Sequence, residues 1–361
     1  MDANDFRAEF PVLGRVAYLN TGTDGPVPRR GFDAATEQLR YELEQGRLGR
    51  PFFERLQANA AALREKLALA YGCDPADVAL TRSTTDGVAT AMSTLRLGRG
   101  DEVLTSDVEH PGLLAPLEAA RRRCGFDVRF VPFDELASEV GPRTKLVACS
   151  HVSWADGRVV DVGALKASGA QVMLDGAQGL GAVCLDMREL GCDFYAASGQ
   201  KWLCGPDGSG SLYVRREVAE TLDPPWPGYA SLAEPSRASD LIAHPGARRF
   251  DLGVAPGPST AWSLAALELL QEAGLDWVTA RAADGAERLA GMLAERGFEV
   301  VPRGRTTLVS WRSSQAEEDV PRLAEQGIIV RFLPGLGLVR ASVGGWTSDE
   351  DLERLVDAAA A

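Results

Sequence analysis

The middle of the chain alternates short apolar, strand-like segments with stretches of helical periodicity. The predicted strands are 101–105, 126–130, 144–150, 170–174, 194–197 and 210–214. A helix is predicted over 113–123, between the first two strands. Strands separated by helices indicate βαβ units, and therefore a largely parallel sheet that helices cover on both faces. The pattern predicts an α/β fold, in which ligands bind beyond the carboxyl ends of the strands.

The last third of the chain has a different pattern. Two long helices are predicted over 259–273 and 277–296, and a closing helix over 349–360. Between them lie four short extended segments, at 299–302, 307–310, 328–331 and 338–342, and a predicted helix at 320–325. This order predicts a smaller α+β domain at the C-terminus.

Composition excludes several classes of function. The chain has 51 acidic and 38 basic residues and a formal net charge of −13, so nucleic-acid and membrane partners are not expected. No apolar run reaches the roughly 20 residues that a membrane span needs. The six cysteines show no CxxC spacing and the chain has three histidines, so we expect no metal site. Reduced thiols in the cytoplasm are the expectation for a chain of this size.

Two residues at the predicted carboxyl edge of the sheet suggest cofactor chemistry. Lys201 follows the strand 194–197 in a turn of small residues, where a flat cofactor can approach the backbone and burial lowers a lysine's pKa. Asp175 ends the strand 170–174, where an aspartate can hold a pyridine nitrogen protonated. Alone, each has a simpler interpretation, as a solvated loop lysine and a helix N-cap. Their spacing of 26 residues lets both reach one end of the sheet.

Three further segments follow predicted strands. Thr84 and Thr85 stand before a predicted helix at 88–94, where hydroxyls and free amides bind phosphate or simply cap the helix. His110 follows the strand 101–105 and could stack on an aromatic cofactor or be an ordinary loop histidine. Trp154 follows the strand 144–150 and could form the wall of a ring pocket or belong to the core.

Together these segments resemble the class V aminotransferase family. This group of fold-type I pyridoxal 5'-phosphate (PLP) enzymes includes cysteine desulfurases, cysteine/cystine C–S lyases and an isopenicillin N epimerase. The resemblance runs from Tyr18 to Ser342 and into the closing helix, and is strongest over 175–178, 191–195 and 198–214. It implies a large domain with a mostly parallel seven-stranded sheet and a smaller α+β C-terminal domain. The implied division is an arm at 1–14 that packs with the small domain, a PLP-binding domain at 15–250 and a small domain at 251–361.

The resemblance also implies roles for individual residues. Lys201 is similar to the lysine that forms a Schiff base with PLP and moves the substrate's α-proton, and Asp175 to the partner of the pyridine nitrogen. Arg340 is similar to the arginine that binds the substrate carboxylate, and Asn20 and Arg331 are expected in the substrate pocket. The implied cofactor contacts are Gln178 to the 3′ oxygen, His110 to the ring, Trp154 beside it, and Thr84, Thr85, Ser198 and Gln200 near the phosphate.

The chain departs from the desulfurase pattern at several positions. Gln200 replaces the usual histidine beside the lysine, and Trp154 replaces an asparagine and is similar to the tryptophan of the C–S lyase branch. The connection from Arg331 to Arg340 is short and has no cysteine, which disfavours persulfide chemistry. Val254 stands where a partner subunit often supplies a threonine to the phosphate.

These observations predict a cytoplasmic, homodimeric PLP enzyme acting on a small amino acid. Our first hypothesis is a C–S lyase that β-eliminates a cysteine-type substrate to an oxo acid and ammonia. Aminotransferase and epimerase activities share its early steps and remain alternatives. Cysteine desulfurase is a weaker one, and a catalytically silent scaffold is the alternative from a different class.

Overall fold

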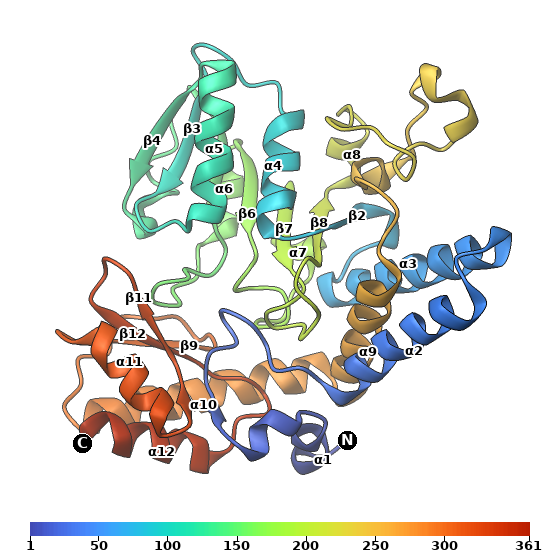
Figure 1. Ribbon diagram of the computed structural model, residues 1–361. Helices are drawn as coiled ribbons and strands as arrows, with labels where there is room; N and C mark the ends of the chain where they lie inside the picture. The colour runs from blue at the N-terminus through green and yellow to red at the C-terminus, as the bar shows by residue number, and fades with distance from the viewer.

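The computed structural model describes residues 1–361, and its centre is a seven-stranded sheet with the order β2-β8-β7-β6-β5-β3-β4 (Figure 1). The strands are β2 (Val78–Thr81), β3 (Glu102–Ser106), β4 (Asp127–Val131), β5 (Thr144–Ser150), β6 (Gln171–Asp175), β7 (Phe194–Ser198) and β8 (Gly210–Val214). Neighbours pair in parallel except at β8, which is antiparallel to both β2 and β7. The predicted α/β fold with a mostly parallel sheet is confirmed, and each of the six predicted strands lies within one residue of its expected bounds.

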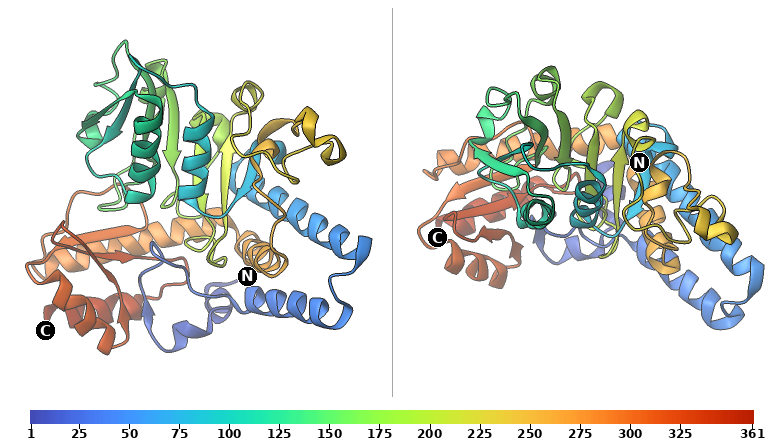
Figure 2. Two further views of the ribbon diagram at one scale, coloured as in Figure 1. Left: turned by 45° about the horizontal axis from the view of Figure 1, so that its top comes forward. Right: turned by 90° about the horizontal axis from the view of Figure 1, so that it is seen from above.

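The central strands are continuous apolar segments because both faces of the sheet are covered. All five residues of β7 are buried, and they alternate between two cores. Phe194 and Ala196 belong to the core on one face, with α4 (Thr84–Thr94) and α5 (Pro111–Cys124). Tyr195 and Ala197 belong to the core on the other face. Figure 2 shows helices on both sides of the sheet. Successive side chains of a strand point to opposite faces, so a strand that is apolar throughout needs a cover on each face.

A long helical hairpin was not anticipated from the sequence. It consists of α2 (Arg29–Gln45) and α3 (Gly49–Tyr71), and α9 (Gly257–Ala273) packs against both helices. Tyr71, at the end of α3, is hydrogen-bonded through its hydroxyl to Ser211 Oγ of β8 at 2.8 Å. This contact joins the hairpin to the sheet.

The C-terminal part contains a three-stranded antiparallel sheet with the order β11-β12-β9. Its elements are α10 (Leu275–Glu295), β9 (Leu308–Arg312), α11 (Ala316–Glu325), β10 (Ile328–Ile329), β11 (Arg331–Leu333), β12 (Leu338–Ser342) and α12 (Asp349–Ala360). The segment 299–302, expected to be extended, forms only a single bridge, between Val300 and Trp311.

The N-terminus contacts the C-terminal part of the chain. In α1 (Ala3–Ala8), Phe6 packs against the rings of Trp277 and Trp346, and Arg7 forms an ion pair with Asp351 at 2.6 Å. Strand β1 (Ala17–Tyr18) pairs in parallel with β10. The division at residues 14 and 250 stays a prediction.

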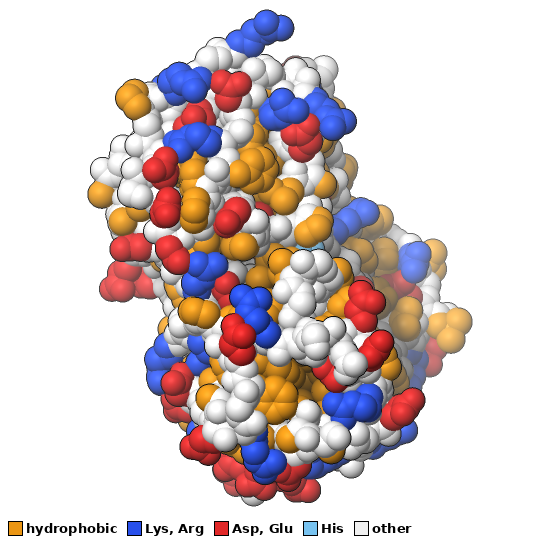
Figure 3. All heavy atoms as spheres, turned by 90° about the vertical axis from the view of Figure 1, so that its left-hand side faces the viewer, with side chains coloured by type: hydrophobic (Ala, Val, Ile, Leu, Met, Phe, Trp, Pro, Cys, Tyr) orange, Lys and Arg blue, Asp and Glu red, His pale blue; other side chains and the backbone are white.

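The remaining helical elements are short. They are η1 (Pro11–Gly14), η2 (Pro75–Asp77), η3 (Phe133–Glu135), α6 (Val162–Ala167), α7 (Met187–Leu190), α8 (Arg216–Ala219), η4 (Pro235–Asp240) and η5 (Gly246–Phe250). None of the helices is both long and apolar enough to cross a membrane. Acidic and basic side chains interleave over the face shown in Figure 3.

Candidate active site

Most of the predicted cofactor residues follow the carboxyl ends of strands that run in one direction. The parallel pairing of β3, β5, β6 and β7 brings these ends to one edge of the sheet. Strand β2 runs the same way, since β8 is antiparallel to both β2 and β7. The last residues of these strands and the segments that follow them include the predicted residues Thr84, Thr85, His110, Trp154, Asp175, Gln178, Ser198, Gln200 and Lys201.

The loops after β2 and β7 meet at the first turn of α4. Thr84 donates its backbone N–H to Ser198 Oγ at 3.0 Å, and the hydroxyls of the two residues are 2.6 Å apart. Thr85 is exposed in the same turn, and a Cβ added at Gly112 would lie 2.7 Å from its Oγ1. Hydroxyls and free N–H groups at a helix N-terminus suit an anion such as phosphate.

His110 and Trp154 meet edge to face, with ring centroids 5.2 Å apart. The Trp154 indole donates to the Val108 carbonyl at 2.9 Å, while His110 Nδ1 accepts the Gly112 N–H at 3.0 Å and caps α5. Burial lowers the pKa of His110 to about 4, and the positive charge of Lys201 adds to the effect. The imidazole is therefore neutral at neutral pH.

Asp175 and Lys201 influence each other electrostatically. Asp175 is buried at the end of β6, where its Oδ1 accepts the Ala177 N–H at 2.9 Å. Burial raises the pKa of Asp175, and the nearby Lys201 opposes that rise. Burial lowers the pKa of Lys201 to about 8, against the opposing charge of Asp175. A much larger fraction of Lys201 than of an ordinary lysine is therefore an unprotonated, nucleophilic amine near neutral pH.

Arg340 of β12 is buried, with 1% of its surface exposed. Its Nη1 donates to the Trp154 carbonyl at 2.7 Å, but its Nε and Nη2 have no partner. Burial lowers the pKa of Arg340 to about 9. A Cβ added at Gly22 would lie 2.9 Å from Nη2 and 2.7 Å from Ser342 Oγ, so glycine keeps this space open. Unpaired donors on a buried guanidinium indicate a site for an anion such as a carboxylate.

The two predicted glutamines are held in different ways. Gln178 donates from Nε2 to the Gly22 carbonyl at 2.8 Å, and its Oε1 accepts the Trp202 indole N–H at 3.0 Å. The second amide N–H of Gln178 has no partner in the chain and is available to a ligand. The expected contact between Gln178 and the 3′ oxygen of the cofactor stays a prediction. Gln200 accepts the Gly25 N–H at its main-chain carbonyl, and its buried side-chain Oε1 has no partner.

Asn20 and Arg331 are linked through Thr23. The Thr23 hydroxyl donates to Asn20 Oδ1 at 2.8 Å and accepts from Arg331 Nη1 at 3.0 Å. Asn20 thus stabilises the turn that follows β1. Arg331 is close enough to Lys201 for its charge to lower the pKa of that lysine.

Two buried residues beside the site were missed in the sequence. Glu109, next to His110, accepts hydrogen bonds from the hydroxyls of Ser106 and Ser150 at 2.5 Å each. Burial raises the pKa of Glu109 to about 7. Trp202, next to Lys201, orients Gln178. The available signal for Glu109 was a carboxylate three residues after β3 and next to His110, whereas nothing local distinguishes Trp202 from a core residue.

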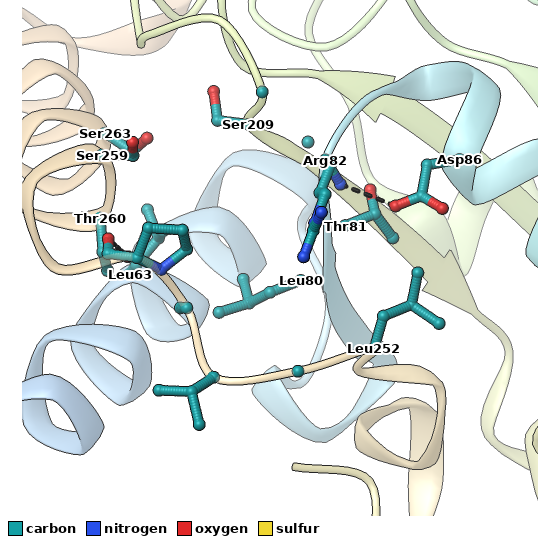
Figure 4. Close-up of a pocket in the computed structure, with 16 residues that line it drawn as sticks. Leu63, Leu80, Thr81, Arg82, Asp86, Ser209, Leu252, Ser259, Thr260 and Ser263 are labelled. Atoms are coloured by element: carbon teal, nitrogen blue, oxygen red, sulfur yellow. Dashed lines mark hydrogen bonds between the residues drawn. The ribbon is translucent and has the colours of Figure 1, made fainter. Parts of the chain in front are cut away.

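The segment that contains Val254 faces the start of α4. Gly253 and Val254 line a pocket together with Thr81, Arg82 and Asp86 (Figure 4). Asp251 anchors the segment through an ion pair with Arg64 at 2.6 Å and by accepting the Leu80 N–H. Half of the Val254 side chain is exposed. No group of three or more His, Cys, Asp or Glu side chains is placed to hold a metal ion.

Comparison with known proteins agrees with this arrangement. The family model described as Aminotransferase class-V matches residues 18–355. The chain belongs to the class V aminotransferase family. It is 29% identical to an isopenicillin N epimerase from Streptomyces clavuligerus, over 99% of this chain and 97% of that protein. It is also 29% identical to the cysteine desulfurase CsdA of Escherichia coli, over 98% of this chain and 96% of that one.

Solved structures of C-DES, a cystine C–S lyase, are similar to this fold. A mutant of C-DES with glycine covalently linked to its PLP cofactor has a TM-score of 0.92 and 28% identity, over 98% of both chains. The complex of C-DES with its product cysteine persulfide has a TM-score of 0.91 and 29% identity, over 97% of this chain and 99% of that one. The class V chain described here is a PLP-dependent enzyme.

The residues of this site fit PLP. Thr84, Thr85 and Ser198 offer hydroxyls and N–H groups to a phosphate, and the neutral His110 ring can lie against an aromatic ring. The buried Asp175 carboxylate suits a protonated pyridine nitrogen. The Lys201 amine makes no hydrogen bond in the chain and is free to bond covalently with an aldehyde.

Proposed function

We propose that this enzyme is a C–S lyase that cleaves the Cβ–S bond of a cysteine-type amino acid. In the balanced reaction, the substrate and one water give a thiol or persulfide, a 2-oxo acid and ammonia. The α-proton leaves Cα, the sulfur leaves Cβ with the bonding electrons, and water then displaces the nitrogen. No external oxidant or reductant is needed.

The observation that carries the proposal is the β11–β12 hairpin. Only residues 334–337 separate the two strands, and Leu333 pairs directly with Leu338. The hairpin contains no cysteine, so no mobile thiol approaches the substrate from this direction to take up its sulfur. Sulfur would therefore leave with the product, as in a lyase. The product named in the C-DES complex, cysteine persulfide, has this chemistry.

The two arginines of the hairpin suit a substrate with carboxylates at both ends. We assign the α-carboxylate to Arg340, whose Nε and Nη2 are buried and unpaired. Arg331 pairs with Arg340 across the hairpin and forms no ion pair, so it is available to a second carboxylate. A disulfide-linked or S-substituted cysteine with a carboxylate at its far end would meet both.

We propose the following roles for the other residues. Bound PLP supplies a ring that withdraws electrons from the substrate's α-carbon, and Asp175 keeps the pyridine nitrogen protonated. Lys201 holds the cofactor and then moves the proton of the α-carbon. Thr84, Thr85 and Ser198 hold the phosphate, with Gln200 near it. His110 and Trp154 confine the ring, and Gln178 contacts its 3′ oxygen.

One experiment under multiple-turnover conditions tests the proposal. The holoenzyme is incubated with L-cystine, L-cysteine and an S-alkyl-L-cysteine, and mass spectrometry follows both the cofactor and the products. We expect pyruvate and ammonia in excess over enzyme, with the cofactor still PLP. Stoichiometric pyridoxamine phosphate with one equivalent of oxo acid would establish an aminotransferase. Loss of chirality at Cα without release of ammonia would establish an epimerase.

We also propose a homodimer located in the cytoplasm. The α2–α3 hairpin projects from the body of the molecule (Figure 1). It exposes the apolar side chains Phe32, Leu39, Leu43, Leu48 and Phe53, and exposed apolar patches of this kind mark interfaces. All six cysteines are unpaired, as in a reducing compartment. Light scattering of the wild type and of Leu43→Glu tests the dimer, which the variant is expected to weaken.

A further inference from the structure

The loop of residues 20–25 contacts both Arg331 and the segment that carries Lys201. At one end, Thr23 accepts a hydrogen bond from Arg331 at 3.0 Å. At the other end, the Gly25 N–H donates to the Gln200 carbonyl at 2.7 Å, and a Cβ at Gly25 would overlap the Lys201 carbonyl. Asp24 stands between these two contacts, one residue from the threonine that binds Arg331 and one from the glycine that contacts the Lys201 segment, and its side chain is exposed.

The Asp24 carboxylate has no partner within the chain. Its main-chain carbonyl is fixed by the Tyr18 hydroxyl at 2.9 Å, but its side chain makes no hydrogen bond or ion pair. Partial burial and the nearby Asp207 raise the pKa of Asp24, and the charges of Lys201 and Arg331 are close enough to oppose that rise. Two opposite charges, Asp24 and Arg331, thus lie near each other without pairing.

A carboxylate and a guanidinium that lie near each other without forming an ion pair are complementary to a ligand that carries both charges. Arg331 alone would accept any distal carboxylate. A carboxylate beside it repels that group unless the ligand also brings a cation. The far half of a symmetrical disulfide amino acid carries an ammonium and a carboxylate on one carbon.

We propose that Asp24 determines substrate specificity by binding the distal ammonium of a substrate whose far end is a zwitterionic amino-acid group. The inference rests on the proposed function for the reaction itself. It goes further because it selects, among S-substituted cysteines, those that end in a second amino acid. Asp24 is a binding residue in this assignment and takes no part in bond cleavage.

Unreactive ligands test the assignment separately from the reaction. The compound (S,S)-2,7-diaminosuberate replaces both sulfurs of L-cystine by carbon and has no leaving group. L-2-Aminosuberate lacks its distal ammonium, and L-2-aminooctanoate lacks both distal charges. Calorimetry gives the Kd of each ligand for the holoenzyme and for Asp24→Asn. We expect the wild type to prefer diaminosuberate over aminosuberate by about tenfold, the value of one charge-assisted hydrogen bond near the surface, and Asp24→Asn to lose that preference.

Three controls give each outcome a meaning. L-2-Aminooctanoate should bind Asp24→Asn and the wild type equally, and Asp5→Asn, an exposed aspartate on α1, should leave all three Kd values unchanged. An equal loss for all three ligands in Asp24→Asn, or no loss for any, would overturn the assignment. With L-cystine and S-ethyl-L-cysteine, the variant should raise KM for L-cystine alone and keep kcat. A wild type that binds diaminosuberate selectively but cleaves neither substrate would refute the lyase proposal and leave the role of Asp24 supported.

Discussion

Replacing Arg340 by methionine should weaken substrate binding and stabilise the substrate-free enzyme at the same time. The guanidinium is buried and has one hydrogen bond, from Nη1 to the Trp154 carbonyl, while Nε and Nη2 are unpaired. A buried, unpaired charge is costly in the absence of its ligand. Methionine is similarly long and unbranched, and it brings no charge.

The pKa of Arg340 sets the size of the stability effect. Burial lowers the pKa from 12.5 to about 9, which corresponds to about 5 kcal/mol of unfavourable free energy for the charged form. Leaving the Trp154 carbonyl without its donor costs about 1 to 3 kcal/mol. The free energy of unfolding of Arg340→Met should therefore exceed that of the wild type by about 2 kcal/mol or more. This gain is comparable to those seen when buried ion pairs are replaced by apolar residues.

The effect on catalysis has the opposite sign. Removing the arginine from a buried carboxylate pair costs about 2 to 5 kcal/mol, so kcat/KM should fall about 30- to 5000-fold. Thermal unfolding of the PLP-loaded enzymes with and without L-2-aminosuberate gives the stability and the ligand binding, and steady-state kinetics gives kcat/KM. The ligand should raise the Tm of the wild type and leave that of Arg340→Met unchanged.

Arg303 provides a matched control. Its side chain is 8% exposed, but it is paired with Glu287 at 2.7 Å and donates to the Leu308 carbonyl. Arg303→Met should therefore lower the Tm. A lower Tm for Arg340→Met as well, or substrate binding as tight as in the wild type, would refute the reasoning that Arg340 is held unpaired for a carboxylate.

Three further predictions follow from the same site. Burial lowers the pKa of Lys201 to about 8, so in the PLP-free protein its acylation should rise as the pH passes through that value. Peptide mass spectrometry should show ordinary lysines reacting about two pH units higher. Reaction of Lys201 only above pH 10 would contradict this. Burial raises the pKa of Glu109 from 4.5 to about 7, so its ionisation destabilises the fold as the pH rises across that window. Glu109→Gln should remove up to about 3 kcal/mol of this pH dependence in urea unfolding, and parallel curves for the two proteins would count against it. Gly22→Ala would place a Cβ 2.9 Å from Arg340 Nη2 and should raise KM at least about tenfold, whereas Gly14→Ala, with open space around it, should have no effect; equal KM values would show that the Gly22 space is unused.

The strands were predictable because a fully buried strand is a continuous apolar segment. The predicted bounds of β5 and β8 match the structure, and those of β7 miss it by one residue. The α2–α3 hairpin was missed since most of its surface is polar or exposed and its burial against α9 depends on a segment about 200 residues away. A local pattern carries no information about such a partner.

The same division holds within the site. Lys201, Asp175 and Thr84 could be found in the sequence because each follows a strand, and parallel strands end at one edge of their sheet. Their contact partners could not be found there. The hydrogen bond from Thr84 to Ser198 spans 114 residues, and the one from Arg340 to Trp154 spans 186.

The sequence by itself determined the α/β class, the edge of the sheet where the candidate site lies and, through resemblance, the family and its cofactor. These properties depend on local hydrophobic periodicity and on short motifs, which neighbouring residues encode. Only the tertiary structure decided which charges are neutralised and which are left for a ligand. Arg340 is buried without an ion pair, and Asp24 and Arg331 lie near each other without forming one, because the burial and spacing of side chains depend on segments brought together by folding.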